Sequence, residues 1–511
     1  MAAHQMNRRE FVGLSAASIA GRILGLGSAG ANTTRDEPWD PAAPLIVTGK
    51  PLRVQPILMY RVAQKREETS WKSWGGVQDD QAAANECRQI AEELRTLATQ
   101  AGFPVEMRPV VKVRSPEEAA QVHASDYDCV IVYAATGSGE TLRACFAPKK
   151  NRDTLIFVRR RSGPVYYWYE ALSTRYLATG YEASGRNSCD DHGPVHIDDV
   201  VVDDGNELLW RLRALYGLKN FVGARIVALG GLWGKYAPDA PQVARERYRL
   251  NIIDVPYEQV TARIEAATKD RGRLQAARCM AERYLALPDT TLVTDKEFVT
   301  NAFLLHGFFK DLMREHEAPV FTIRGCMTTI LPIAKTTPCL TLGLLNDEGL
   351  MAFCESDFVI IPAGILLHYI SGKPVFMHNS TFPHKGIVTA AHCSAPRRLD
   401  GVHYEPARIM THYESEYGAA PKVEIPVGQQ VTFVDPEYST GRWLGFTGVV
   451  EGNPLYEVCR SQQDVEIQGD WKKLCSEVRD SHWMMVYGDH LKELGYAARK
   501  IGIDWIDLSA A

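Results

Sequence analysis

The chain has 511 residues, of which 45% are hydrophobic and 23% charged, a balance typical of soluble globular protein that is too long for one compact core. We therefore expect two or three domains. The formal net charge of -5 argues against nucleic acid and anionic lipid as partners. Beyond the N-terminal segment, no stretch reaches the roughly 18 uncharged apolar residues that a membrane span needs, so we expect none.

The first 31 residues are typical of a twin-arginine export signal. Arg8 and Arg9 precede Phe11, a weakly apolar run follows at 14–27, and 29–31 (Ala-Gly-Ala) offers small residues for cleavage. The alternative is a basic, disordered N-terminus. The export interpretation predicts a periplasmic or secreted protein, and it is compatible with a metal that is loaded in the cytoplasm before export.

After a polar, proline-containing linker, the chain has the pattern of a doubly wound, flavodoxin-like parallel α/β domain over 46–215. Apolar strands alternate there with helical segments whose buried positions recur every three or four residues. The predicted strands are 52–60, 105–113, 129–133 and 154–158, and helices are predicted around 87–98 and from Pro116.

A second α/β domain is predicted over 216–372, and a β-rich domain with a terminal helix over 373–511. In the second domain, strands are predicted at 225–229 and 250–255 and long helices at 274–287 and 296–315. The last part changes to short alternating runs separated by turn residues, as at 423–425, 430–434 and 443–449. The overall prediction is therefore two doubly wound α/β domains followed by a β-rich C-terminal domain.

The cysteines and glycines do not by themselves predict a site. Eleven cysteines is an odd number, and none has CxxC spacing, so a disulfide framework or structural zinc is unsupported and most are expected to be buried small apolar side chains. Thr136–Gly139 lacks the full phosphate-loop pattern. Gly230, Gly231 and Gly234 imitate a dinucleotide fingerprint with the wrong spacing, so both runs predict plain turns.

The strongest chemical signal is a pair of acids, Glu355 and Asp357, directly before the apolar run 358–370, which predicts a buried helix. Ionised carboxylates at the edge of a core are costly unless they are paired or bind a metal. The alternative is an ordinary helix cap with an acid in the first turn.

Histidines that follow these acids favour a metal or substrate site over the helix cap. Imidazole and carboxylate are common metal ligands, and among the histidines that follow this acidic pair five are candidates, spread over about a hundred residues. They are His378, His384, His392, His412, which is followed by Glu414, and His482 near the C-terminus.

The same region resembles the L-fucose isomerase family and its fucose isomerase-like relatives. The resemblance lies in 354–379 with its Glu-x-Asp pattern, in 391–393, and in the closing run 482–489 with its His-x4-Tyr-Gly signature. These motifs recur together and in order, and all of them lie after about Pro338. The layout of two α/β domains and a β-rich domain also resembles that family.

The resemblance implies a Mn²⁺-dependent enzyme that moves a proton between two sugar carbons through an enediol. In the family, a glutamate, an aspartate and a histidine hold the metal. By position, the glutamate is Glu355 and the histidine is His482, while Asn379 stands where the family has the aspartate. A hard cation suits carboxylate and imidazole ligands and polarises a carbonyl.

Asn379 changes the expected chemistry, because an amide can coordinate a metal through oxygen but cannot transfer the proton. Glu355, Asp357 and Asn379 are thus the predicted catalytic positions, and Glu355, His482 and Asn379 the predicted metal ligands. The replacement acid or base is predicted among Asp357, Glu414, His378 and His392. The predicted substrate-binding residues are His378, His392, His412, Glu414 and Trp483.

Three functions remain open from the sequence. The first is an exported metal-dependent isomerase acting on a fucose- or arabinose-type sugar. The second is a carbohydrate-cleaving enzyme, a glycoside hydrolase or lyase on the same fold, which Asn379 and the export signal favour. The third is a non-catalytic sugar-binding protein, against which the presence of Glu355, Asp357 and His482 argues. The family resemblance also implies a homo-oligomer, a trimer or hexamer.

Overall fold

The computed structural model describes residues 39–148, 152–161, 172, 177, 195–437, 441–477, 480 and 482–509. The predicted export signal at 1–31 lies outside these residues and stays a prediction. Within the part of the chain that is described, no helix is both long enough and apolar enough to cross a lipid bilayer.

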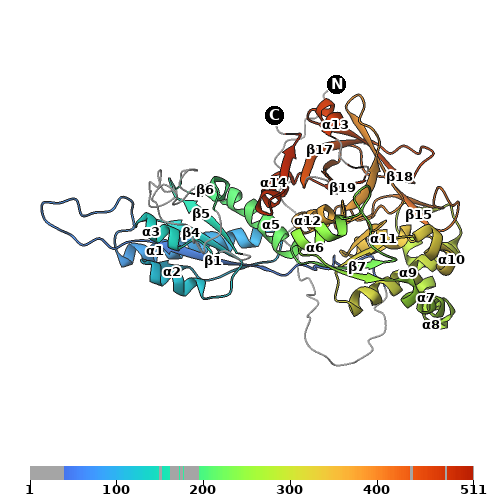
Figure 1. The fold of residues 1–511 in the computed structure, drawn as a ribbon, viewed down its shortest axis with the longest axis horizontal. Coiled ribbons are helices and arrows are strands. Elements are labelled where there is room, and N and C mark those ends of the chain that lie inside the picture. The colour runs from blue at the N-terminus through green and yellow to red at the C-terminus, as the bar shows by residue number, and fades with distance from the viewer. Residues whose placement is uncertain are drawn as a thin grey trace, which may run out of the picture.

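The N-terminal part is an α/β unit built on one parallel sheet (Figure 1). Its elements are β1 (Leu52–Met59), α1 (Asp80–Gln100), β2 (Val105–Met107), β3 (Val111–Val113), α2 (Pro116–His123), β4 (Cys129–Ala134), α3 (Gly139–Ala144), β5 (Asp153–Val158), the 3-10 turn η2 (Ile197–Asp199) and β6 (Val200–Val202). The strand order is β2-β1-β4-β5-β6, with β3 also paired to β1, and all these pairings are parallel. Strand β4 is buried throughout, as its uninterrupted apolar run predicts.

The strand predicted over 105–113 is two short strands in the structure. Both β2 and β3 pair with β1, and Pro109 lies between them. Proline has no backbone N–H to donate to a neighbouring strand, so the ladder stops there and resumes at Val111.

The second α/β unit is built on a smaller parallel sheet. Its elements are α5 (Gly205–Phe221), β7 (Arg225–Leu229), α6 (Ala240–Arg247), β8 (Asn251–Val255), α7 (Tyr257–Lys269), α8 (Arg271–Leu285), β9 (Thr290–Leu292), α9 (Lys296–Glu315), β10 (Val320–Ile323), the π-helical turn η3 (Cys326–Ile330), α10 (Leu331–Ala334), α11 (Cys339–Asp347), β11 (Met351–Cys354) and α12 (Ile361–Ser371). The sheet order is β11-β10-β7-β8, and each pairing is parallel.

The C-terminal part is an antiparallel, barrel-like sheet. Its elements are β12 (Phe376–Ser380), β13 (Ile387–His392), β14 (Ala407–Met410), β15 (Ala420–Val423), β16 (Gln430–Pro436), β17 (Arg442–Gly452), β18 (Ser461–Gln468), α13 (Trp471–Glu477), β19 (His482–Tyr487), α14 (Leu491–Lys500) and β20 (Asp504–Asp507). The order β16-β19-β12-β13-β18-β17 closes on itself because β16 also pairs with β17, and β20 adds to β17 in parallel. Strands β14 and β15 lie outside this sheet and form a separate three-stranded sheet with β9. These sheets confirm the predicted α/β class with a β-rich C-terminal part.

Long helices and shared strands connect the three parts. The predicted boundary at 215/216 lies inside α5, which packs against α12 and α14 (Figure 1). Strand β9 of the second part pairs with β14 of the third. The boundary at 372/373 follows Gly372, whose left-handed conformation ends α12.

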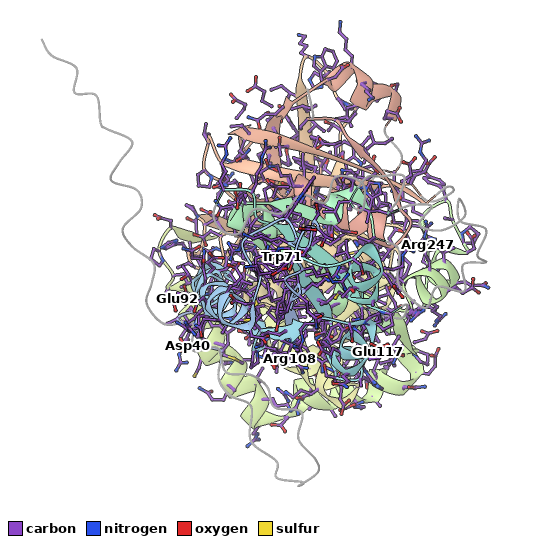
Figure 2. All side chains as sticks on the ribbon, turned by 90° about the vertical axis from the view of Figure 1, so that its left-hand side faces the viewer. Asp40, Trp71, Glu92, Arg108, Glu117 and Arg247 are labelled. Carbon is purple, nitrogen blue, oxygen red and sulfur yellow. The ribbon has the colours of Figure 1, made fainter. Side chains whose placement is uncertain are left out.

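An extended loop over 60–79 projects from the N-terminal unit at the left of Figure 1. Figure 2 is viewed from that side and shows Trp71 of this loop in front of the unit. Trp74 is 72% exposed. The loop lies at the end of the molecule away from the C-terminal barrel, so it does not contribute to the site described next within one chain.

Candidate functional site

The predicted acids lie at the carboxyl edge of the second parallel sheet. The order β11-β10-β7-β8 means that the chain places β8 on one side of β7 and β10 on the other. Open α/β sheets bind ligands beyond the carboxyl ends of strands at such a reversal. Asp357 follows β11 and forms a bridge with Trp233 in the loop after β7, so the two loops meet at this edge.

The turn that carries the acids has an unusual backbone. Glu355 and Ser356 have φ angles of 63° and 51°, which places two consecutive non-glycine residues in the left-handed region. Each such residue costs about 1–2 kcal/mol. The helix predicted from Phe358 therefore begins later, at Ile361, and its N-cap is Ile360 without a side-chain cap. Neither acid is the N-cap of α12 itself, although Asp357 Oδ1 accepts the Val359 backbone N–H and so caps the turn that leads into the helix.

Asp357 is the buried anchor of the site. Its Oδ2 lies 2.6 Å from Nδ1 of His482, and both side chains are fully buried. Its Oδ1 accepts the backbone N–H groups of Lys235 at 3.0 Å and Val359 at 3.2 Å. Because the carboxylate accepts from three sides, it fixes the orientation of the His482 ring.

The other ring nitrogen of His482 faces Glu355. Nε2 lies 3.5 Å from Oε2 of Glu355, and this buried nitrogen has no hydrogen-bond partner among the described residues. Glu355 has a side chain 39% exposed, so it is the end of the array that a ligand can touch. A carboxylate, an imidazole and a second carboxylate thus form one line from the interior to the surface.

The pKa values of this line reflect its paired charges. Burial alone lowers the pKa of His482, but the carboxylates of Asp357 and Glu355 outweigh it and raise that pKa to about 9. Burial raises the pKa of Glu355, but His482, His392 and Lys235 outweigh it and lower that pKa to about 2. At neutral pH the pair is a carboxylate beside an imidazolium.

His392 lies on the other side of Glu355. Its Nε2 is 4.0 Å from Oε1 of Glu355. Its Nδ1 lies 2.8 Å from the Ser394 hydroxyl and accepts the Ser394 backbone N–H at 3.3 Å, so the neutral ring carries its proton on Nε2. Burial lowers the pKa of His392, which keeps it neutral at pH 7 and aims an N–H towards the site.

Asn379 stands beside His482 in the barrel sheet. The register pairs it with His482 on β19 and with Ala391 on β13. Directly opposed residues share a face of the sheet, so the half-buried Asn379 lies on the face of His482. The structure therefore brings together Glu355, Asp357, His482, His392 and Asn379.

His378 and Trp483 are placed elsewhere. Each is one residue from a site position, and side chains alternate between faces along a strand. Both are fully buried inside the barrel, with ring centroids 6.3 Å apart, and both pack on Phe433. Burial lowers the pKa of His378 to about 3. The structure does not bring these two predicted substrate-binding residues to Glu355.

His412 and Glu414 form a local pair in the turn after β14. The distance between His412 Nε2 and Glu414 Oε2 is 4.0 Å, and the Glu414 side chain is 77% exposed. His412 is buried, and its ring lies 3.2 Å from the Ser415 hydroxyl. Its interaction with His392 contributes to lowering the pKa of His392, so this turn borders the site without supplying its centre.

The donor set suits a divalent metal with open coordination positions. In the described ranges, no group of three or more histidine, cysteine, aspartate or glutamate side chains is arranged to hold an ion. The pair of Glu355 and the unpartnered Nε2 of His482 is present, however, with the Asn379 amide on the same face. Metal-binding histidines commonly donate their other N–H to a carboxylate, which is the role of Asp357.

Sequence reasoning missed three contributors to the site. The Lys235 backbone N–H orients Asp357, the residue Ser394 fixes the tautomer of His392, and several cysteines surround both acids and histidines. The sequence does contain a signal for the cysteines, because Cys354 directly precedes Glu355 and Cys393 directly follows His392.

Comparison with models of known protein families gives no match for this chain, and comparison with curated proteins gives none either. The functional assignment consequently depends on the geometry of these residues and on the resemblance of their motifs.

Proposed function

We propose that the protein is a divalent-metal-dependent enzyme of the sugar aldose–ketose isomerase type, acting on a fucose- or arabinose-type carbohydrate through an enediol or enediolate. The observation that carries the proposal is the buried Asp357–His482 pair, whose unpartnered Nε2 faces the half-exposed carboxylate of Glu355 at 3.5 Å. This combination orients the Nε2 of one imidazole and one carboxylate towards the same accessible point, and a bound ion would displace the Nε2 proton.

Glu355 and His482 would hold the metal, with the amide oxygen of Asn379 as a further ligand, and Mn²⁺ is the ion that the family resemblance favours. When bound, such an ion polarises the sugar carbonyl and stabilises the negative charge that develops on its oxygen. Asp357 accepts the Nδ1–H of His482, which leaves Nε2 as the nitrogen that would coordinate the ion once its own proton is displaced.

Glu355 and His392 divide the proton transfer. Glu355 is the carboxylate of the line that a substrate can touch, so it accepts the proton from the carbon beside the carbonyl. His392 presents its Nε2–H across a 4.0 Å gap and donates that proton to the neighbouring oxygen. Glu355 then gives its proton to the former carbonyl carbon, and His392 takes the proton of the neighbouring hydroxyl group. These two transfers complete the conversion of aldose to ketose.

Physical grounds favour His392 as the replacement acid in this proposal. Asp357 is committed to three hydrogen bonds, and His378 is enclosed in the barrel core. Glu414 is directed largely into solvent, with its side chain 77% exposed. His392 alone among the four predicted candidates combines burial with proximity to Glu355.

A second candidate function is carbohydrate cleavage by a glycoside hydrolase or lyase on the same fold. The observation that favours it is Asn379, which lies beside His482 and replaces a carboxylate with a group that cannot transfer a proton. An exported enzyme would also meet glycans rather than free cytoplasmic sugars. A non-catalytic sugar-binding protein is a third, weaker candidate.

Three further features belong to this proposal. They are two doubly wound α/β domains, the first flavodoxin-like; export to the periplasm or beyond through the twin-arginine signal; and assembly into a trimer or hexamer. Light scattering on the purified protein measures the oligomeric state.

The test is solvent exchange with free L-fucose, D-arabinose and related aldoses in D₂O, with Mn²⁺ or with a chelator. The proposal predicts metal-dependent formation of the ketose and deuterium incorporation at C2 of the recovered aldose. Glu355→Gln should abolish both, whereas Glu466→Gln, an exposed control on β18, should not. Release of reducing ends from a glycan panel without exchange would select the cleavage function instead.

A further inference from the structure

Three cysteines form a buried group beside the site. Cys339 at the start of α11, Cys393 after β13 and Cys459 before β18 pack together with Met327, although they are far apart in the sequence. Cys339 and Cys393 are buried, while Cys459 is partly exposed. Cys279 on α8 is exposed and lies outside this group.

The strand register brings two of these cysteines within bonding range. The β13–β18 ladder ends with His392 opposite Ser461, and just beyond it the Arg460 backbone N–H donates to the Cys393 sulfur at 3.4 Å. Cys459 directly precedes Arg460, and its side chain contacts that of Cys393. A disulfide joins residues whose Cα atoms lie about 4.4–6.8 Å apart, the range in which such neighbouring side chains meet.

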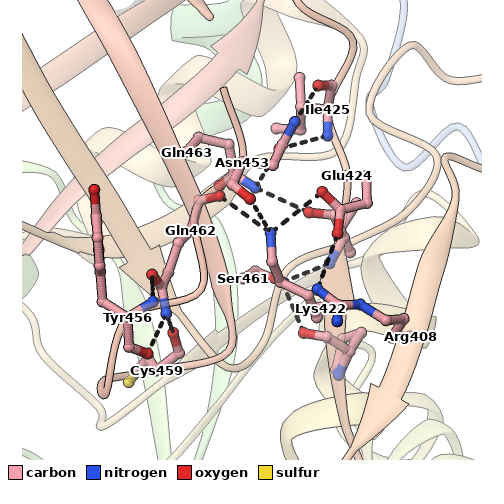
Figure 3. A network of polar contacts seen from close by, with 12 residues as sticks. Arg408, Lys422, Glu424, Ile425, Asn453, Tyr456, Cys459, Ser461, Gln462 and Gln463 are labelled. Carbon is pink, nitrogen blue, oxygen red and sulfur yellow. Dashed lines mark hydrogen bonds and ion pairs between the residues drawn. The ribbon is translucent and has the colours of Figure 1, made fainter. Parts of the chain in front are cut away.

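The side chain of Gln462 holds the segment that carries Cys459 through three hydrogen bonds. The buried Gln462 amide donates to the carbonyls of Cys459 at 2.8 Å and Tyr456 at 3.0 Å, and its oxygen accepts the Tyr456 N–H at 2.7 Å (Figure 3). These three bonds hold both ends of the turn against β18. The Cys459 sulfur thus keeps its place next to Cys393 without a covalent bond.

The surroundings of Cys393 also favour its thiolate. Hydrogen bonds from Cys339 and Cys459, together with the nearby His412 and His392, lower the pKa of Cys393 well below its usual range. The same contacts raise the pKa of Cys339 and of Cys459.

We propose that Cys393 and Cys459 are a redox-active pair that hydrogen peroxide converts to a disulfide. The Cys393 thiolate attacks one peroxide oxygen, the O–O bond breaks, and a sulfenic acid and one water result after protonation. The Cys459 sulfur then attacks the Cys393 sulfur, the S–O bond breaks, and a second water leaves. Two thiols are oxidised by two electrons in total, and the peroxide is reduced to two waters.

The test uses the reduced full-length protein, treated with hydrogen peroxide, blocked with an alkylating reagent and digested with trypsin without reduction. Trypsin separates Cys393, in 386–397, from Cys459, in 443–460, and places Cys339 in a peptide that begins at Thr336. The expected product is a cross-linked pair of the first two peptides. Cys279→Ser should leave that product unchanged.

Two results would overturn the proposal. One is recovery of Cys393 and Cys459 as separately alkylated or over-oxidised peptides after peroxide treatment. This result is obtained with the wild-type protein and does not depend on the folding of a variant. The other is a cross-link of Cys393 to Cys339 in place of Cys459. In folded Cys459→Ser protein, the expected result is a Cys393 sulfenic acid that a dimedone probe labels.

Discussion

His482 and Asp357 are joined by a contact of 2.6 Å between Nδ1 and Oδ2, although 125 positions separate them in the chain. Both side chains are fully buried, and one belongs to the barrel while the other belongs to the second α/β unit. The contact therefore fixes the barrel against the sheet edge where Glu355 lies.

Asp357→Asn should weaken divalent-metal binding by about 10–100-fold, because the His482 ring loses the charged acceptor that orients it. Calorimetric titration of the variant with Mn²⁺ measures the change. Asp239→Asn, at an exposed position before α6, is the control and should bind as the wild type does. Equal Mn²⁺ affinities for the wild type and both variants would show that Asp357 does not orient His482 for metal binding.

Asn379→Asp should tighten Mn²⁺ binding, because it adds a carboxylate on the sheet face of His482. Asn379→Ala should weaken binding because it removes the amide oxygen. The two variants move the affinity in opposite directions only if position 379 contacts the metal. A parallel change in both, measured by the same titration, would place this side chain outside the coordination sphere.

His392→Asn should lower kcat by about 10²–10⁴-fold with a smaller effect on KM, because it removes the Nε2–H that protonates the substrate oxygen. The matched control is His384→Asn, in the exposed turn between β12 and β13. Steady-state kinetics of ketose formation distinguish the two. A kcat unchanged in the His392 variant would show that another group carries the proton.

Glu348, which lies away from the site, should make a pH-dependent contribution to the free energy of unfolding. Burial raises its pKa, but His306 and Lys310 outweigh burial and lower it to about 2. A carboxyl whose folded pKa is depressed stabilises the fold above its unfolded pKa, and this stabilisation disappears as the pH falls towards 2. The shift corresponds to about 3 kcal/mol at neutral pH.

Urea unfolding of Glu348→Gln between pH 7 and pH 3 measures this contribution. The difference in unfolding free energy from wild type should be largest at pH 7 and shrink as the pH is lowered. Glu282→Gln, whose side chain is 60% exposed, should differ little at any pH. A difference for Glu348→Gln that stays constant with pH would contradict the pKa assignment.

Elements with strong periodicity were predictable from sequence. The helix 296–315 and the strand 225–229 have the predicted bounds, because their apolar positions fit one period without interruption. The strand 105–113 was not predicted correctly, because Pro109 breaks its ladder. The helix after the acids starts three residues late, since the left-handed residues Glu355 and Ser356 carry no signal that periodicity detects.

Part of the site could be predicted and part could not. The family resemblance implied that Glu355 and His482 share a site, and the structure brings their side chains within 3.5 Å. His378 and Trp483 could not be assigned to a face, because a strand with apolar neighbours on both sides has no period-2 signal. The clustering of Cys339, Cys393 and Cys459 could not be predicted, because it depends on the β13–β18 register, which no local sequence pattern encodes.

The most direct test of the metal-dependent function is metal content after equilibrium dialysis of the chelator-treated protein against Mn²⁺. The proposal predicts about one tightly bound ion per chain in the wild type and none in Glu355→Gln or His482→Gln, because both ligands are needed. Glu466→Gln should retain the ion. Absence of a stoichiometric ion from the wild-type protein would contradict the metal-dependent function.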